Sequence, residues 1–392
     1  MARLWRRIPL RRKKDARCPI SRLPNELIIL IAWSLSPEDI STLIQTCRGF
    51  AQLLEPILYP QLAQHYRRNA RNETVLCWAA KTDQVSVINK IRTAAIRKEH
   101  LEASFVFLAM LEAAKLGHTA TMISLLELGG DLYDLNPSKN QSRALLESCA
   151  LHDAAGAGHV DAVQALLDHG VDVNIAHGVS VLASAAQNGK SETVQFLVTR
   201  GADIKARNLI AFAVKSRDPD LVRFLLNKGA EIDGSLYYLG EGEEAPALVW
   251  AQKLRTHSTV RLLLERGADP NVASLQGREA ALHVATKDSD VKSVELLLKY
   301  GAEVNIQDRH GHSPLHNAAR TWYTRKLFAR QREKIIQLLL ERGADVLATD
   351  SHGDTPLIIS RRWGRQRIIN ILAKATEEAI RKRESDMADS SL

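Results

Sequence analysis

Cysteine and long apolar segments are scarce in this 392-residue sequence. No apolar run approaches the ~18 residues that a transmembrane helix needs, and no apolar segment follows the N-terminal arginines as it would in a secretory signal. The cysteines, which have neither Cys-x-x-Cys spacing nor metal-finger partners, are Cys18, Cys47, Cys77 and Cys149. We therefore expect reduced thiols, no membrane partner, and a cytoplasmic and/or nuclear location.

Sequence motifs that accompany bond-making chemistry are also missing. The chain contains no nucleophile elbow, no P-loop, no dinucleotide-binding fingerprint and no His-Glu-x-x-His helix. The run nearest to a metal site holds His310, His312 and His316, but the first two stand on a predicted turn and the third near the start of a predicted helix. We expect no metal site there. The sequence predicts a protein that is not an enzyme and that uses no cofactor.

Positive charge is concentrated at the N-terminus. The formal net charge is +8, and the first 17 residues contribute +7 of it, so the rest of the chain is nearly neutral. A basic arm on a neutral body favours a localisation signal or a docking arm over a nucleic-acid-binding domain. We expect residues 1–20 to be a disordered basic arm, and no nucleic-acid partner. The arm is compatible with nuclear import, with a plain solvated tail, or with a mitochondrial presequence, although Pro9 would break the helix that a presequence needs.

The chain contains a short sequence motif that recurs along its length. Residues 263–269 read Leu-Leu-Glu-Arg-Gly-Ala-Asp, and close copies span residues 297–303 and 339–345. Weaker copies end at Gly129, Gly170, Gly201 and Gly229. Successive glycines of this set stand 28 to 42 residues apart, which indicates a stacked-repeat protein. In each copy a leucine run closes a predicted amphipathic helix, and the glycine supplies the positive φ of its C-terminal cap.

A second recurring motif stands at the start of the other predicted helix of each repeat unit. Residues 313–319 read Ser-Pro-Leu-His-Asn-Ala-Ala, with a hydroxyl at the N-cap and proline in the first turn. Residues 281–285 and 355–357 stand at the same place in their units. Together the two motifs resemble the ankyrin repeat, which consists of a turn, an inner helix, a tight connection and a longer outer helix. The resemblance implies an all-α solenoid with short hairpin turns over residues 74–375, in about eight or nine units that are degenerate in the first half. A charged tail is expected at residues 376–392.

Residues 21–60 differ in kind from the repeats. Three short helices are predicted there, and the first is apolar on all sides over residues 27–33. So few residues cannot hide that much apolar surface among themselves. We expect them either to cap the first repeat or to bind a partner, and residues 61–73 to connect them with the array.

The apolar pattern of this segment has a family resemblance. Leu-Pro-x-Glu-Leu-Ile at residues 23–28, Leu-x-Pro-x-Asp-Ile-x-x-Leu at 35–43 and Cys-Arg-x-Phe at 47–50 together resemble an F-box. The resemblance implies a three-helix domain that binds the small linker subunit of a cullin-based (SCF) ubiquitin ligase. The positions that would contact the linker subunit are Leu23, Pro24, Ile28, Ile31, Ile40, Leu43, Cys47 and Phe50. Leu58-Tyr59 stands where the family usually has a trailing tryptophan.

Two insertions interrupt the repeat period, and both are predicted to project from the stack. The first, residues 233–245, carries tyrosines and glutamates. The second, residues 320–332, places aromatic residues among basic ones, a combination typical of binding hot spots. The basic residues expected to attract an acidic or phosphorylated client segment are Arg320, Arg325, Lys326, Arg330 and Arg332. Alternatively, Trp322 folds back onto the outer helices. The candidate client-binding residues are Tyr237, Tyr238, Trp322, Tyr323, Arg325, Phe328 and Arg330.

Function is therefore expected to reside in surfaces. Joined to an F-box, the array is interpreted as the substrate receptor of an SCF ubiquitin ligase, with the F-box on the linker subunit of the cullin complex and the repeats on a protein client. The alternative hypothesis is an ankyrin scaffold or nuclear regulator whose N-terminal helices only cap the array.

Overall fold

The computed structural model describes residues 75–95, 103–134, 140–175, 179–206, 208–233, 245–320, 326–363 and 366–389. Within these ranges the chain is helical and contains no strand; isolated bridge residues occur at Val179 and in the antiparallel pair Ala273 and Ala280. The predicted all-α class is confirmed for this part of the chain. None of the helices in these ranges combines the length and the apolar character of a membrane span. The basic arm, the predicted F-box and the connector at residues 61–73 lie outside the described residues.

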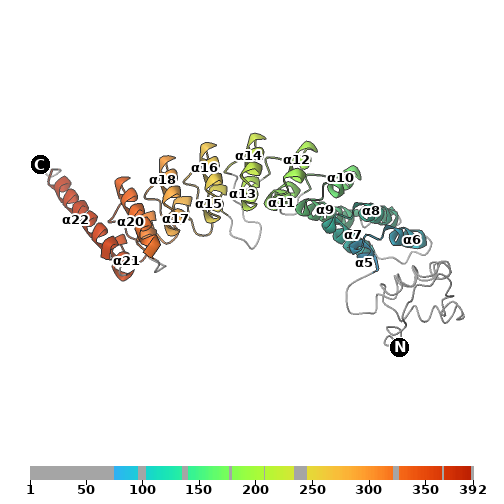
Figure 1. Cartoon of the computed structure of the whole chain (residues 1–392), viewed down its shortest axis with the longest axis horizontal. Coiled ribbons are helices and arrows are strands. Elements are labelled where there is room, and N and C mark those ends of the chain that lie inside the picture. Colours follow the sequence, from blue (N-terminus) through green and yellow to red (C-terminus); the bar gives the residue numbers. More distant parts are fainter. Residues whose placement is uncertain are drawn as a thin grey trace, which may run out of the picture. The chain divides into compact units, whose positions relative to one another are not determined.

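The chain divides into two compact units, Met1–Asp172 and Val173–Leu392. The described helices of the first unit are α5 (Val75–Lys81), α6 (Val85–Ala95), α7 (Ala103–Leu116), α8 (Thr119–Asp134), α9 (Asn140–Ala157) and α10 (Val160–Asp168). Helices α5, α7 and α9 pack in one row, and α6, α8 and α10 form a second row against them (Figure 1). Val106 and Met110 of α7 and Met122 and Leu125 of α8 are buried between the rows. This two-row arrangement is the inner and outer helix pattern of a helical repeat.

The prediction that a helix ends at Gly129 is wrong. Helix α8 passes through this glycine and ends at Asp134. Gly129 is buried, and a Cβ built on it would lie 3.8 Å from the side chain of Val106 on α7. Packing on α7 keeps this segment helical, although glycine alone favours a helix end.

The second unit holds twelve described helices that alternate between an inner and an outer row. The inner helices are α11 (Val181–Gln187), α13 (Leu209–Lys215), α15 (Ala247–Lys253), α17 (Ala281–Lys287), α19 (Pro314–Ala319) and α21 (Pro356–Trp363). The outer helices are α12 (Ser191–Thr199), α14 (Pro219–Asn227), α16 (His257–Glu265), α18 (Val291–Lys299), α20 (Lys326–Glu341) and α22 (Gln366–Asp389). Each inner helix packs on the next inner helix, and the hairpin turns between repeats lead back from the outer row to the inner row (Figure 1).

Outer helices of this unit end at glycine, as predicted. The glycines that follow α12, α14, α16, α18 and α20 all have φ between 82° and 92°. One residue later, an alanine N–H closes the cap on a carbonyl five residues earlier, as from Ala268 to Leu263 at 3.0 Å. A Cβ at Gly267 would meet nothing within 4 Å, so the backbone conformation, and not lack of space, selects glycine.

Two outer helices are longer than predicted. Helix α20 begins at Lys326 and has 16 residues against nine in α18, so residues 326–332 of the second insertion extend a helix instead of forming a loop. Helix α22 continues to Asp389 through residues that were expected as a charged tail. Its residues are mostly good helix formers, and Lys374 pairs with Glu378 one turn later at 3.9 Å. Charge alone therefore did not mark the end of the helix.

Candidate protein-interaction surface

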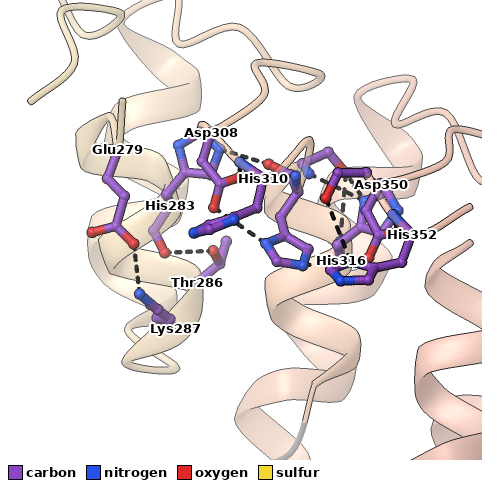
Figure 2. Close-up of polar contacts among 12 residues, drawn as sticks. Glu279, His283, Thr286, Lys287, Asp308, His310, His316, Asp350 and His352 are labelled. Carbon is purple, nitrogen blue, oxygen red and sulfur yellow. Dashed lines mark hydrogen bonds and ion pairs between the residues drawn. The ribbon is translucent and has the colours of Figure 1, made fainter. Parts of the chain in front are cut away.

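Inner helices α17 and α19 are each anchored by a buried histidine (Figure 2). Nδ1 of His283 accepts a hydrogen bond from the N–H of Ala280 at 3.1 Å, and Nε2–H donates to the carbonyl of His312 in the next repeat at 3.0 Å. His316 repeats both bonds at 3.1 Å, one to its own N-cap residue and one to the following repeat. Burial lowers the pKa of both histidines, which keeps Nδ1 unprotonated and able to accept. These histidines hold neighbouring repeats together and are not available to a ligand.

Aspartates organise the hairpin turns before α19 and α21. Oδ1 of Asp308 accepts from the N–H groups of His310 and His312 at 2.8 and 2.9 Å, and Asp350 makes the matching bonds in the next turn at 2.8 and 3.0 Å. The imidazole of His312 lies between the two carboxylates, 3.3 Å from Asp308 and 3.4 Å from Asp350. Burial raises the pKa of Asp350, but hydrogen bonds from two backbone N–H groups and the neighbouring histidines outweigh it, so that the pKa is lowered. Among the described residues, no group of three His, Cys, Asp or Glu could hold a metal ion.

An open cavity of about 370 Å³ lies between these turns and the inner helices. It is lined by the turns around Gly277 and Arg309, by Lys287 and Asn317 from the inner helices, and by Arg320 directly after α19. Asn317 is 4% exposed, and its Nδ2 has no hydrogen-bond partner within the described part of the chain. A buried donor left without an acceptor costs ~1–3 kcal/mol.

A second hollow, of about 590 Å³, lies among helices α16, α18 and α20 and is lined by Asp290, Glu295 and Arg330, among others. Arg330 is exposed there, as a client-binding residue must be. The other client candidates are not described as side chains: Phe328 lies on α20, and Tyr237, Tyr238, Trp322, Tyr323 and Arg325 fall outside the described residues. The eight F-box positions also fall outside them. Their roles stay predictions.

Arg332 corrects one expectation about the second insertion. Its side chain does not face a partner, because the residue is only 4% exposed. Nε donates to Oγ of Ser289 at 2.9 Å, and the guanidinium also donates to the carbonyls of Arg320 and Lys287. These carbonyls lie at the ends of α19 and α17, where helices leave acceptors unsatisfied and favour a cation. Arg332 therefore ties the start of α20 to the preceding repeat.

Sequence reasoning missed a group of basic and aromatic side chains on the inner helices. Lys215 Nζ lies 5.1 Å from the ring centre of Phe212 on its own helix and 4.5 Å from that of Trp250 on the next one. Lys253 Nζ lies 5.8 Å from the same Trp250 ring. Both aromatic residues are partly exposed. Aligning the sequences of the inner helices at their last turns would have revealed this group.

Comparison with known proteins places these helices among ankyrin repeats. The family model for ankyrin repeats matches residues 109–208, 248–346 and 282–383, which is more than half of the chain. The chain is 35% identical over 111 residues to the ankyrin repeat protein FPV031 of Fowlpox virus (strain NVSL), covering 28% of this chain and 32% of that protein. It is 31% identical over 220 residues to ankyrin repeat and SAM domain-containing protein 6 of Danio rerio, covering 50% of this chain and 29% of that protein.

The chain thus spans about a third of the length of these relatives. Among solved structures, the crystal structure of the ankyrin repeat domain of Bcl-3 is 29% identical to the chain, with a TM-score of 0.46. That alignment covers 57% of this chain and 97% of the other.

Proposed function

The chain belongs to the ankyrin-repeat proteins, and from this premise we propose that it is a protein-interaction scaffold that holds a partner protein on its repeat array. Ankyrin repeats are typically interaction modules without catalytic activity. Repeats of a solenoid contact only their neighbours, so the turns and the outward side of the inner helices remain accessible along the array.

The observation that carries this proposal is the open cavity of about 370 Å³ between the hairpin turns and the inner helices. The histidine and aspartate side chains around it hold the turns and the inner helices, as His283 and Asp308 do. The exposed residues Lys287 and Arg309 line the cavity and are accessible to a partner.

Residues 21–60 favour a finer second function, that of a substrate receptor of an SCF ubiquitin ligase. Its support is the sequence pattern that begins at Leu23 and Pro24 and ends at Phe50. The F-box would bind the linker subunit, and the array would hold the client. The tether between them would raise the effective concentration of the client near the ubiquitin-charged enzyme.

Co-purification with the purified linker subunit tests the F-box. We expect the pair Leu23→Ala, Pro24→Ala to abolish co-purification while leaving thermal unfolding of the array unchanged. Truncation of Ile31 or Leu43 to alanine would each weaken binding by ~2–4 kcal/mol if the side chain is buried at the interface. If the wild-type chain never binds the linker and deletion of residues 21–60 destabilises the array, these helices are a cap, and the scaffold function stands alone.

Proximity labelling tests whether the second insertion contacts the client. Substitution is better than deletion here, because α20 begins at Lys326 and a deletion would shorten it. The variant changes Trp322, Tyr323, Arg325 and Arg330 to alanine. We expect it to keep linker binding and lose the labelled client; an unchanged set of labelled proteins would show that the insertion is not the client site.

A further inference from the structure

Neighbouring hairpin turns are joined by a side chain that stands four residues after the glycine of a helix cap. Asparagine does this at three places, Asn174, Asn271 and Asn305. In each case Oδ1 accepts from a backbone N–H of the next turn at 2.7 or 2.8 Å, and Nδ2 donates to the carbonyl of the next cap glycine at 3.1 to 3.3 Å. Lys205 and Leu347 hold the same place in two other turns and lack this amide. One asparagine therefore makes two hydrogen bonds to the next turn, one as acceptor and one as donor.

Asp233 takes this place in the turn after α14, four residues after Gly229. Its Oδ2 accepts from the N–H of Asp269, in the turn after α16, at 2.9 Å, which is the acceptor half of the asparagine pattern. Its Oδ1 is buried and has no hydrogen-bond partner in the described part of the chain. Equivalence with the asparagines puts this oxygen where their amide stands, toward the carbonyl of Gly267. A carboxylate cannot donate, so the donor half of the pattern is missing.

The surroundings of Asp233 increase its affinity for a proton. Burial raises the pKa of its carboxyl above the ordinary value of 3.8; the hydrogen bond from the N–H of Asp269 opposes this shift in part, and the negative charge of Asp269 adds to it. The carboxylate of Asp269 is the charge that the facing turn presents to Asp233. A protonated carboxyl has what the asparagine amide has, an acceptor oxygen and a donor. A proton on Oδ1 therefore supplies the missing donor.

We propose that Asp233 is a proton-dependent latch between the hairpin turns that follow α14 and α16. With the proton, Oδ1–H donates to the carbonyl of Gly267, and both hydrogen bonds of the asparagine pattern are made. Without the proton, two oxygen atoms face each other, and only the bond from the N–H of Asp269 joins this side chain to the next turn. At neutral pH these turns are therefore held less firmly than the turns that Asn271 joins.

The latch responds to pH in the opposite direction to the buried histidines. Because folding raises the pKa of Asp233, the stability that the latch contributes is full below pH 3.8 and is lost as the pH rises through the folded pKa. The lowered pKa values of His283 and His316 instead remove stability as the pH falls below 6.5. Acid therefore tightens the turns after α14 and α16 while it loosens the repeats that contain α17 and α19.

The test compares the full chain with the variant Asp233→Asn, whose amide supplies the donor at every pH. Hydrogen exchange of the Asp269 N–H reports on the latch directly, because this N–H donates to Asp233. We expect the variant to slow this exchange about 3- to 10-fold at pH 7.5, which corresponds to one added hydrogen bond. The ratio between variant and wild type should fall as the pH is lowered to 4, because the wild type then gains the same bond.

Asn271→Asp is the matched reciprocal variant, because Asn271 makes both bonds of the pattern to the next turn. It should speed exchange of the Glu303 N–H about 3- to 10-fold at pH 7.5, and this loss should shrink as the pH falls. A second readout is the carboxyl carbon-13 resonance of Asp233, which is assigned by its absence from Asp233→Asn. We expect it to titrate above pH 3.8.

Three results would overturn the proposal. The first is an Asp233 carboxyl that titrates at or below pH 3.8. The second is exchange of the Asp269 N–H that is as fast in Asp233→Asn as in the wild type at pH 7.5. The third is a ratio of exchange rates that does not change with pH, which would show that the asparagine acts without replacing a proton-dependent bond.

Discussion

Replacing His316 by alanine removes the side chain that joins two neighbouring repeats. The residue is fully buried, its Nδ1 accepts from the N–H of Ser313 at 3.1 Å, and its Nε2–H donates to the carbonyl of Asp354 at 3.1 Å. The variant leaves one donor and one acceptor without their partner, at ~1–3 kcal/mol for each that stays buried. Because water can reach the more exposed carbonyl side, we expect the free energy of opening of this repeat pair to fall by about 2–4 kcal/mol.

Native-state hydrogen exchange measures this loss repeat by repeat, which suits an array whose units interact mainly with their neighbours. The amides of α19 and α21 should lose protection most, and those of α11 and α13 least. His352→Ala is the matched control, because His352 is exposed and lies in the next turn; we expect a change within ~0.5 kcal/mol. A loss below ~0.5 kcal/mol for the His316 variant as well would refute the reasoning that the two bonds couple the repeats.

Three further outcomes follow from the same structure. The free energy of unfolding of the second unit should fall as the pH drops below 6.5, the ordinary histidine pKa. The pKa values of His283 and His316 are lowered in the folded protein, so the unfolded chain takes up protons first, and each histidine lowers the stability by up to ~1.4 kcal/mol per pH unit. Urea unfolding of the wild type and of a variant with both histidines changed to alanine, between pH 7.5 and 5, measures this loss. Gly267→Ala should cost about 1 kcal/mol or more in the same assay, because φ is 86° there. Arg332→Ala should lower the protection of α20 by about 2–4 kcal/mol, while Arg330→Ala, two residues away and exposed, should change it by less than ~0.5 kcal/mol.

Local sequence patterns predicted the repeats well where the chain obeys short-range rules. The glycine caps of the second unit and the start of α19, where Ser313 Oγ accepts the N–H of His316 at 3.5 Å, needed only turn and capping chemistry. The prediction failed at Gly129, because packing against α7 outweighs the preference of a glycine to end a helix. The prediction of a charged tail also failed, because lysine and glutamate are good helix formers and an exposed helix can carry them as well as a disordered segment can.

The interaction surface depended on contacts that local patterns do not reveal. Arg332 was read as a partner-binding residue, but its guanidinium donates to the carbonyl of Lys287, 45 residues earlier in the chain. Asn317 occupies an ordinary inner-helix position of the sequence, and only the structure shows that its buried Nδ2 has no hydrogen-bond partner among the described residues.

The most direct test of the scaffold account is quantitative proximity labelling in cells with three versions of the full chain. The first is the wild type, and the second is an inner-row variant with Lys215, Lys253 and Lys287 changed to glutamine. The third is an outer-row control with Lys228, Arg261 and Lys299 changed to glutamine. The account predicts a set of labelled proteins that is retained by the outer-row control and reduced for the inner-row variant. Identical labelling by all three versions would contradict the claim that the inner-helix face of the array holds the partner.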